Sequence, residues 1–220
     1  MIGGIDFCIP RNFGNKEWEK MILVETLLGV IFSVLLGVIA GQKTQKEPEV
    51  QSVGETKTLE FMEKKFELKF KDTDKPVKIY EYFSGKDTPD NWIEMMEFQI
   101  YPMNREGNEP MDFAKRIAAA FIKNYPYMKY SLLSEEKTGS VLLDFFYPES
   151  TRKEKNKEFI EFNAFKFYRE PGGNRTIAVH YAKNIENTKT TRKSEDVVND
   201  IRKTRSEIIP ALAKFPNFSQ

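Results

Sequence analysis

Hydrophobic and polar residues alternate along most of the chain after residue 58, and this period of two predicts β-strands. Phe66, Leu68 and Phe70, for example, alternate with charged residues, which is typical of a strand with one buried face. About seven strands are expected on this basis. They cover Leu59–Lys71, Pro76–Phe83, Asn91–Tyr101, Met128–Leu133, Val141–Tyr147, Glu158–Tyr168 and Thr176–Lys183.

Two segments show the spacing of an amphipathic helix instead. The first begins at Pro110, a residue suited to the first helical position, and ends near Asn124 before Pro126. Its apolar side chains share one face, so it is expected to cover a sheet. The second begins at Ser194, a good N-cap, and Pro210 is expected to kink or end it.

The predicted order is therefore βββαββββα, in the α+β class. Glycines in the turns at 137–139 and 171–174 favour tight hairpins, so neighbouring strands should be antiparallel. The segment FIEFNAFKFY, residues 159–168, is apolar on both faces and predicts a central strand covered on both sides. We expect one α/β sandwich domain, an antiparallel sheet with packed helices, over 58–214. A polar linker over 41–57 precedes it, and a tail over 215–220 follows.

An unbroken apolar run, TLLGVIFSVLLGVIA, occupies residues 26–40. Its length is typical of a bacterial secretory signal peptide and falls short of the ~20 residues of a spanning helix. The small side chains of Val38 and Ala40 suit cleavage before Gly41. Residues 21–40 taken together reach the spanning length, so an uncleaved anchor stays open, with Met21 as an alternative start. Residues 1–40 are thus interpreted as a leader. The protein is expected to be exported, with a periplasmic or extracellular domain. If the leader is not cleaved, the protein is anchored in the inner membrane and the domain lies outside the cytoplasm.

Composition fits a folded domain: 40% of the residues are hydrophobic, 13% aromatic and 30% charged. The formal net charge of +1 does not call for a nucleic-acid partner. The single cysteine, Cys8, precedes the apolar run, so the exported part is expected to lack disulfides, and no lipid-bearing cysteine follows the run. A His-rich metal site is excluded because the chain has one histidine, and no cofactor is expected.

Four residues form the candidate ligand or partner patch: Trp92, Tyr101, Asp144 and His180. Asp144 lies between apolar strand neighbours, where a carboxyl pKa can rise, and pairing with His180 is considered. Without a glycine-flanked serine nucleophile, no catalytic residue is assigned. His180 also fits simple packing in a strand, and Trp92 fits either an exposed patch or the core.

The strand and helix order resembles the PsbP-like, or DcrB-like, family of secreted α/β sandwich domains. The resemblance rests on FELKF at 66–70, the helix PMDFAKRIAAAFIKNYP, the hairpins around Gly139 and Gly173, and the helix after Ser194. It implies a non-catalytic secreted domain that binds a ligand or assists an assembly, and it assigns no active-site residues. The lipid-bearing cysteine of DcrB-like lipoproteins is absent.

The segment MILVETLLGVIF, which begins at Met21, also resembles the start of a type IV pilin or pseudopilin, with Glu25 as its fifth residue. Lys20 replaces the glycine that precedes the processed bond in that family, and Pro48 would break the long helix. The leading hypothesis is a non-catalytic exported envelope domain that binds an envelope protein or a small ligand. A pilin-like subunit anchored by 21–40 and a small secreted enzyme are the alternatives. Membrane contact is expected only through 21–40, if this segment is not cleaved.

Overall fold

A computed structural model describes residues 52–54, 56–102, 109–150, 152–173, 175–188 and 192–219, which belong to one compact unit. The predicted leader, the pilin-like segment and most of the linker lie outside these residues. Within the described residues, no helix combines the length and the apolar character needed to cross a membrane.

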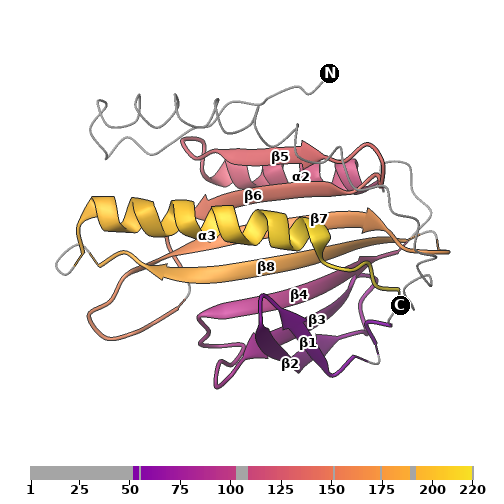
Figure 1. Ribbon diagram of the computed structural model, residues 1–220, viewed down its shortest axis with the longest axis horizontal. Helices are drawn as coiled ribbons and strands as arrows, with labels where there is room; N and C mark the ends of the chain where they lie inside the picture. Colours follow the sequence, from indigo (N-terminus) through magenta and orange to yellow (C-terminus); the bar gives the residue numbers. More distant parts are fainter. Residues whose placement is uncertain are drawn as a thin grey trace, which may run out of the picture. The chain divides into compact units, whose positions relative to one another are not determined.

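Eight strands form a single antiparallel sheet in the order β1-β2-β3-β4-β8-β7-β6-β5 (Figure 1). The strands are β1 (Thr58–Phe61), β2 (Lys64–Asp72), β3 (Lys78–Ser84), β4 (Glu94–Tyr101), β5 (Tyr130–Ser134), β6 (Val141–Tyr147), β7 (Phe159–Arg169) and β8 (Thr176–Glu186). Helix α2 (Pro110–Asn124) follows β4, and helix α3 (Ser194–Lys214) follows β8. The predicted antiparallel α+β class is confirmed, and the sheet has one strand more than the expected seven.

The additional strand comes from a turn inside the segment predicted as one strand, Leu59–Lys71. Phe61 pairs with Lys64, so Met62 and Glu63 form a two-residue turn, with φ values of 51° and 62°. This left-handed conformation usually requires glycine, asparagine or aspartate. Neither Met62 nor Glu63 indicates such a turn, and the sequence pattern therefore predicted a continuous strand.

The two helices lie on opposite faces of the sheet (Figure 1). Helix α3 packs on β6, β7 and β8, and we call this side the α3 face; α2 packs on β5, β6 and β7 of the other side, the α2 face. Strand β7 is therefore covered on both sides, as its two apolar faces predicted. The segment from Pro110 to Asn124 is helical as expected, whereas α3 continues past Pro210 to Lys214.

The main hydrophobic core lies on the α3 face and extends beyond residues 58–214. It includes Val53 from the predicted linker and Phe215 and Phe218 from the predicted tail. The backbone N–H of Val53 donates to the Ser219 carbonyl at 2.8 Å, and Ser52 pairs with Ser219 in a parallel bridge. Both ends of the described domain are thus held together at the edge of this core.

Candidate functional site

Directly paired residues of neighbouring strands form a row of side chains across the α2 face. The row is polar on the uncovered strands and becomes apolar on the strands that α2 covers. Glu81 of β3 pairs with Glu97 of β4, which pairs with His180 of β8, which pairs with Phe165 of β7. At the other end, Phe70 of β2 lies opposite Glu81 and is 42% exposed. Because α2 packs on β5, β6 and β7, the polar part of the row lies on β3, β4 and β8. We call this region of the α2 face the polar half-face.

Six side chains of the polar half-face and its border form a continuous hydrogen-bonded chain. The Tyr101 hydroxyl donates to the Gln99 amide oxygen, and the Gln99 amide nitrogen donates to Glu97. His180 Nδ1 lies 3.4 Å from Glu97 Oε1, and His180 Nε2 lies 2.8 Å from Asn163 Oδ1. The Asn163 amide nitrogen then donates to Glu161 Oε1 at 3.0 Å. This polar chain connects three strands through buried and half-buried groups.

His180 is the centre of the polar chain. Its ring stacks on Phe165, with centroids 4.0 Å apart and planes 4° apart, and the residue is 7% exposed. Both ring nitrogens face acceptor oxygens, because Asn163 uses its nitrogen toward Glu161. The ring is therefore held at both nitrogens by neighbouring polar side chains.

The carboxylates of the polar half-face outnumber its one basic side chain. Burial raises the pKa of Glu81 to about 7, with the nearby Glu97 raising the pKa further and His180 opposing the rise. Burial also raises the pKa of Glu161, against the hydrogen bond from Asn163. The region therefore carries negative charge and is able to hold a proton near neutral pH. Within the described ranges, no group of three or more His, Cys, Asp or Glu side chains is arranged to hold a metal ion.

The structure brings three of the four predicted patch residues to the same face. Tyr101 and His180 belong to the polar chain. Trp92 is only 8% exposed and packs with Phe83, Met95 and Ala182 at the end of the polar half-face. Trp92 is therefore a core residue, consistent with the second interpretation made for it.

Asp144, the fourth predicted residue, lies on the α3 face, whereas His180 lies on the α2 face. It is 4% exposed, and Arg205 Nε donates to its Oδ1 at 2.9 Å. The considered pairing of Asp144 with His180 is therefore wrong. The reason is the register, in which Asp144 lies opposite Ala164 and His180 lies opposite Phe165, the next residue of the same strand.

Sequence reasoning missed five members of the row and the chain: Glu81, Glu97, Gln99, Glu161 and Asn163. Glu97 and Gln99 alternate with apolar residues, and this pattern usually indicates a solvent-facing side of a strand. The signal available in the sequence was Asn163, an amide in a strand segment rich in phenylalanine. In the structure this residue is 1% exposed. A buried amide requires hydrogen-bond partners, and here they are His180 and Glu161.

A separate pocket of about 130 Å³ lies on the α3 face, between the β1–β2 turn and α3. We call it the hairpin pocket. Its walls combine aromatic, aliphatic and charged side chains: Phe61, Met62, Lys64, Phe66, Glu94, Tyr181, Lys183, Thr204, Glu207 and Ile208.

The buried carboxylate of Glu94 organises one side of the hairpin pocket. Lys64 Nζ donates to both Glu94 oxygens, at 2.8 and 2.7 Å, and Lys183 Nζ lies 3.6 Å from Oε1. Burial raises the pKa of the Tyr181 hydroxyl, and the nearby Glu94 charge raises the pKa further. Tyr181 therefore stays protonated, and its hydroxyl forms a hydrogen bond with the Glu94 carboxylate.

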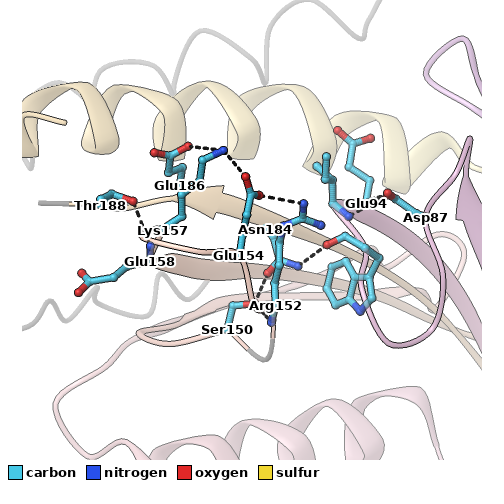
Figure 2. A network of polar contacts seen from close by, with 12 residues as sticks. Asp87, Glu94, Ser150, Arg152, Glu154, Lys157, Glu158, Asn184, Glu186 and Thr188 are labelled. Carbon is cyan, nitrogen blue, oxygen red and sulfur yellow. Dashed lines mark hydrogen bonds and ion pairs between the residues drawn. The ribbon is translucent and has the colours of Figure 1, made fainter. Parts of the chain in front are cut away.

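A polar network holds the connections at one end of the sheet (Figure 2). Asn184 of β8 donates to the Trp92 carbonyl at 2.8 Å and accepts from Ser150 of the β6–β7 connection. Lys157 of the same connection forms ion pairs with Glu154 and Glu186. Because most of these charged groups are exposed, we assign the network a structural role, which includes fixing Trp92.

Taken together, the described residues form an antiparallel α+β domain with a polar half-face and a small pocket on opposite sides. The model of a protein family of unknown function matches residues 53–217, and the chain belongs to this family. No curated protein and no solved structure matches the chain.

Proposed function

We propose that this protein is a non-catalytic exported binding domain that binds a basic segment of another envelope protein on the polar half-face. Export is inferred from the apolar run at residues 26–40. A binding role also agrees with the resemblance to PsbP-like domains, which remains a prediction. Neither inference identifies the surface that a partner contacts, so the surface is argued from the structure.

The observation that supports this surface is the row from Phe70 to His180. Glu81 and Glu161 are half-buried on the same face, so their carboxylates are within reach of a partner, whereas Glu97, next to Glu81 in the row, is buried. Among the described hydrogen bonds of the polar chain, His180 is the basic side chain that contacts these carboxylates, while Arg116 acts on Tyr101 at the far end of the chain. A lysine or arginine side chain supplies the missing charge.

Phe70 adds an apolar contact to this acidic surface. It is 42% exposed and lies directly opposite Glu81. An arginine that pairs with Glu81 is able to place its guanidinium against the Phe70 ring in a cation–π contact. A basic segment with arginine therefore complements the surface better than an acidic or a purely apolar segment.

The same geometry supports a role other than catalysis. In the described part of the chain, the His180 ring nitrogens face Glu97 and Asn163, and the ring lies flat on Phe165. A histidine that activates a nucleophile needs one ring nitrogen directed at a hydroxyl or thiol. His180 instead links Glu97 and Asn163 within the polar chain.

The test measures binding of the full chain to synthetic peptides by isothermal titration calorimetry. An arginine-rich decapeptide is expected to bind, and its affinity is expected to fall as salt is raised. Salt screens interactions between exposed charges over about 10 Å at 0.1 M ionic strength. Glu81→Gln and Phe70→Ser are each expected to weaken binding about fivefold to tenfold. Glu195→Gln, an exposed carboxylate in the first turn of α3, is the matched control and should bind like the wild type.

The proposal is overturned if a glutamate-rich decapeptide binds as tightly as the basic one. It is also overturned if Glu81→Gln and Phe70→Ser bind the basic peptide with unchanged affinity. Thermal unfolding of each variant checks that lost binding does not come from lost structure.

The pilin-like and enzyme alternatives remain predictions. Intact mass and N-terminal sequencing of the protein from the cell envelope separate export from anchoring. A mature chain that starts near Gly41 supports a released domain, and retention of residues 21–40 supports an anchored or pilin-like subunit.

A further inference from the structure

We infer that the hairpin pocket binds a free α-amino acid with a small apolar side chain. The pocket lies on the α3 face, so this inference is independent of the partner proposed for the polar half-face. It rests on three properties of the pocket: an apolar wall of limited size, two hydrogen-bonding groups, and a balance of charges at its rim.

The apolar wall determines the size of the side chain. Phe61, Phe66 and Ile208 are at most 4% exposed and supply aromatic and aliphatic surface. The volume of about 130 Å³ is comparable to a cavity of roughly 150 Å³ that accepts benzene. A branched side chain of three or four carbons therefore fits, and a large aromatic side chain together with its head group does not.

Two polar groups at the pocket are able to hydrogen-bond to a ligand. Lys183 Nζ lies 3.6 Å from Glu94, beyond hydrogen-bond distance, whereas Lys64 is bonded to both Glu94 oxygens. Thr204 of α3 is 4% exposed as a residue and lines the pocket, to which it contributes a side-chain hydroxyl. A ligand that hydrogen-bonds to this hydroxyl gains a modest amount of affinity.

The chemistry of these groups favours a carboxylate. An ammonium donates charge-assisted hydrogen bonds to carboxylate oxygens, and a threonine hydroxyl is able to donate another. Lys183 and Thr204 come from β8 and α3, so a carboxylate bound by both would connect the sheet and the helix.

A second charge at the rim distinguishes an amino acid from a simple carboxylic acid. Glu207 lines the pocket from α3, is exposed, and makes no ion pair with the described residues. The two lysines and two glutamates of the pocket balance each other, so a ligand with a net charge is disfavoured. A zwitterion places its carboxylate toward Lys183 and its ammonium toward Glu207 without changing this balance.

Met62 forms the exposed edge of the pocket. It is 40% exposed and is held there by the left-handed turn between β1 and β2. The flexible thioether side chain is able to adjust to apolar groups of different shape. The pocket is therefore expected to accept several aliphatic amino acids rather than a single one.

The test titrates the full chain with L-leucine by isothermal titration calorimetry. Two analogues remove one charged group each: 3-methylbutylamine lacks the carboxylate, and 4-methylpentanoate lacks the ammonium. Leucine is expected to bind with a Kd below about 1 mM, and each analogue at least about tenfold more weakly, since a charge-assisted hydrogen bond is lost.

Variants assign the two charged groups to their protein partners. Thr204→Val and Lys183→Met are expected to weaken leucine binding about tenfold and to leave 3-methylbutylamine binding unchanged. Glu207→Gln should weaken leucine binding and leave 4-methylpentanoate binding unchanged. Lys193→Met, at the N-cap of α3 and outside the pocket lining, is the matched control.

The inference is overturned if leucine gives no binding heat up to about 10 mM. It is equally overturned if both analogues bind as tightly as leucine, or if leucine binding is unchanged in Thr204→Val and Lys183→Met. Thr204→Val conserves side-chain shape, so it tests the hydroxyl even if the lysine variant does not fold.

Discussion

The two sides of β4 place neighbouring residues in different environments. Phe98 faces α3 and lies in an aromatic core, with Tyr82 at 5.9 Å and Phe218 at 5.0 Å between ring centroids. Gln99, the next residue, faces the polar half-face and bonds to Glu97 and Tyr101. The comparison shows that one strand supports the core with one side and carries a polar surface on the other. The polar side occurs where α2 does not pack on the sheet.

Buried carboxylates on the two faces also differ in their charged partners. On the α3 face, Asp144 is paired with Arg205, and Glu94 is paired with Lys64. On the polar half-face, Glu81, Glu97 and Glu161 have only His180 as a basic neighbour in the polar chain. Burial and the nearby Glu97 raise the pKa of Glu81 to about 7, so this carboxyl group of the polar half-face responds to pH near neutrality. Stability on the α3 face and charge on the polar half-face are therefore separable by mutation.

The largest expected effect comes from Phe98→Ala. Removing this fully buried ring leaves a cavity and should lower the free energy of unfolding by about 3–5 kcal/mol. Gln99→Ala, one residue along β4, is the control and should cost less than about 1.5 kcal/mol, since the half-buried amide loses two hydrogen bonds. Urea unfolding measures both values. Equal losses would contradict the assignment of the core to the α3 face.

A smaller loss is expected for Arg205→Met, which leaves Asp144 buried without its cation. Breaking a buried pair costs about 3–5 kcal/mol, and partial exposure of Arg205 should reduce this to about 2–3 kcal/mol. The double variant Arg205→Met and Asp144→Leu should recover most of the loss, because no unpaired charge remains. Chemical denaturation of the single and double variants measures the difference. A double variant as unstable as Arg205→Met would rule out this explanation.

The smallest effect concerns the pH dependence of the polar half-face. The pKa of Glu81 is raised from its ordinary value of 4.5 to about 7 in the folded protein. Between these values the folded state binds more protons than the unfolded state, so stability falls as pH rises from about 4.5 to 7 and then levels off. The loss should be on the order of 1 kcal/mol, because solvent screens this half-buried group.

Glu81→Gln is the variant that tests this pH dependence. It removes the titrating group, so stability should change less between pH 5 and pH 8 than in the wild type. The exposed Glu195→Gln should keep the wild-type dependence. Urea denaturation at the two pH values provides the measurement, and an unchanged slope in Glu81→Gln would disprove the assignment to this carboxyl group.

Most helices and strands were predictable because the sequence alternates clearly and marks its turns. Val141–Tyr147 and Pro110–Asn124 agree with the structure at both ends. The β1–β2 turn was missed because Met62 and Glu63 adopt a backbone conformation that their residue types do not indicate. The path of α3 past Pro210 did not follow from the sequence. A proline inside a helix removes a backbone hydrogen bond and clashes with the carbonyl four residues earlier, which usually kinks or ends the helix, whereas α3 continues to Lys214.

The candidate site was predictable only in part because it depends on contacts between distant strands. His180 and Tyr101 were chosen as individual residues, and the structure places both in the polar chain. Their connection through Gln99 and Glu97 depends on the register of β4 with β8, which alternation within a strand does not specify. Alternation within a strand also does not specify which face of the sheet a residue occupies. For this reason Asp144 and His180 were considered as a pair although they lie on opposite faces. The hairpin pocket depends on the missed turn and was not predicted.

The pairing of Ser52 with Ser219 has a mechanical consequence. Since the two residues lie side by side, anything attached before residue 52 and anything attached after residue 219 leaves the domain at the same corner. A pull between these two attachments loads that parallel bridge, and it also loads the bonds that hold the ends to the sheet, from Tyr82 to the Val53 carbonyl and between Tyr168 and Phe218. The two ends therefore form one anchored corner of the domain, fastened to β3 and β7 as well as to each other.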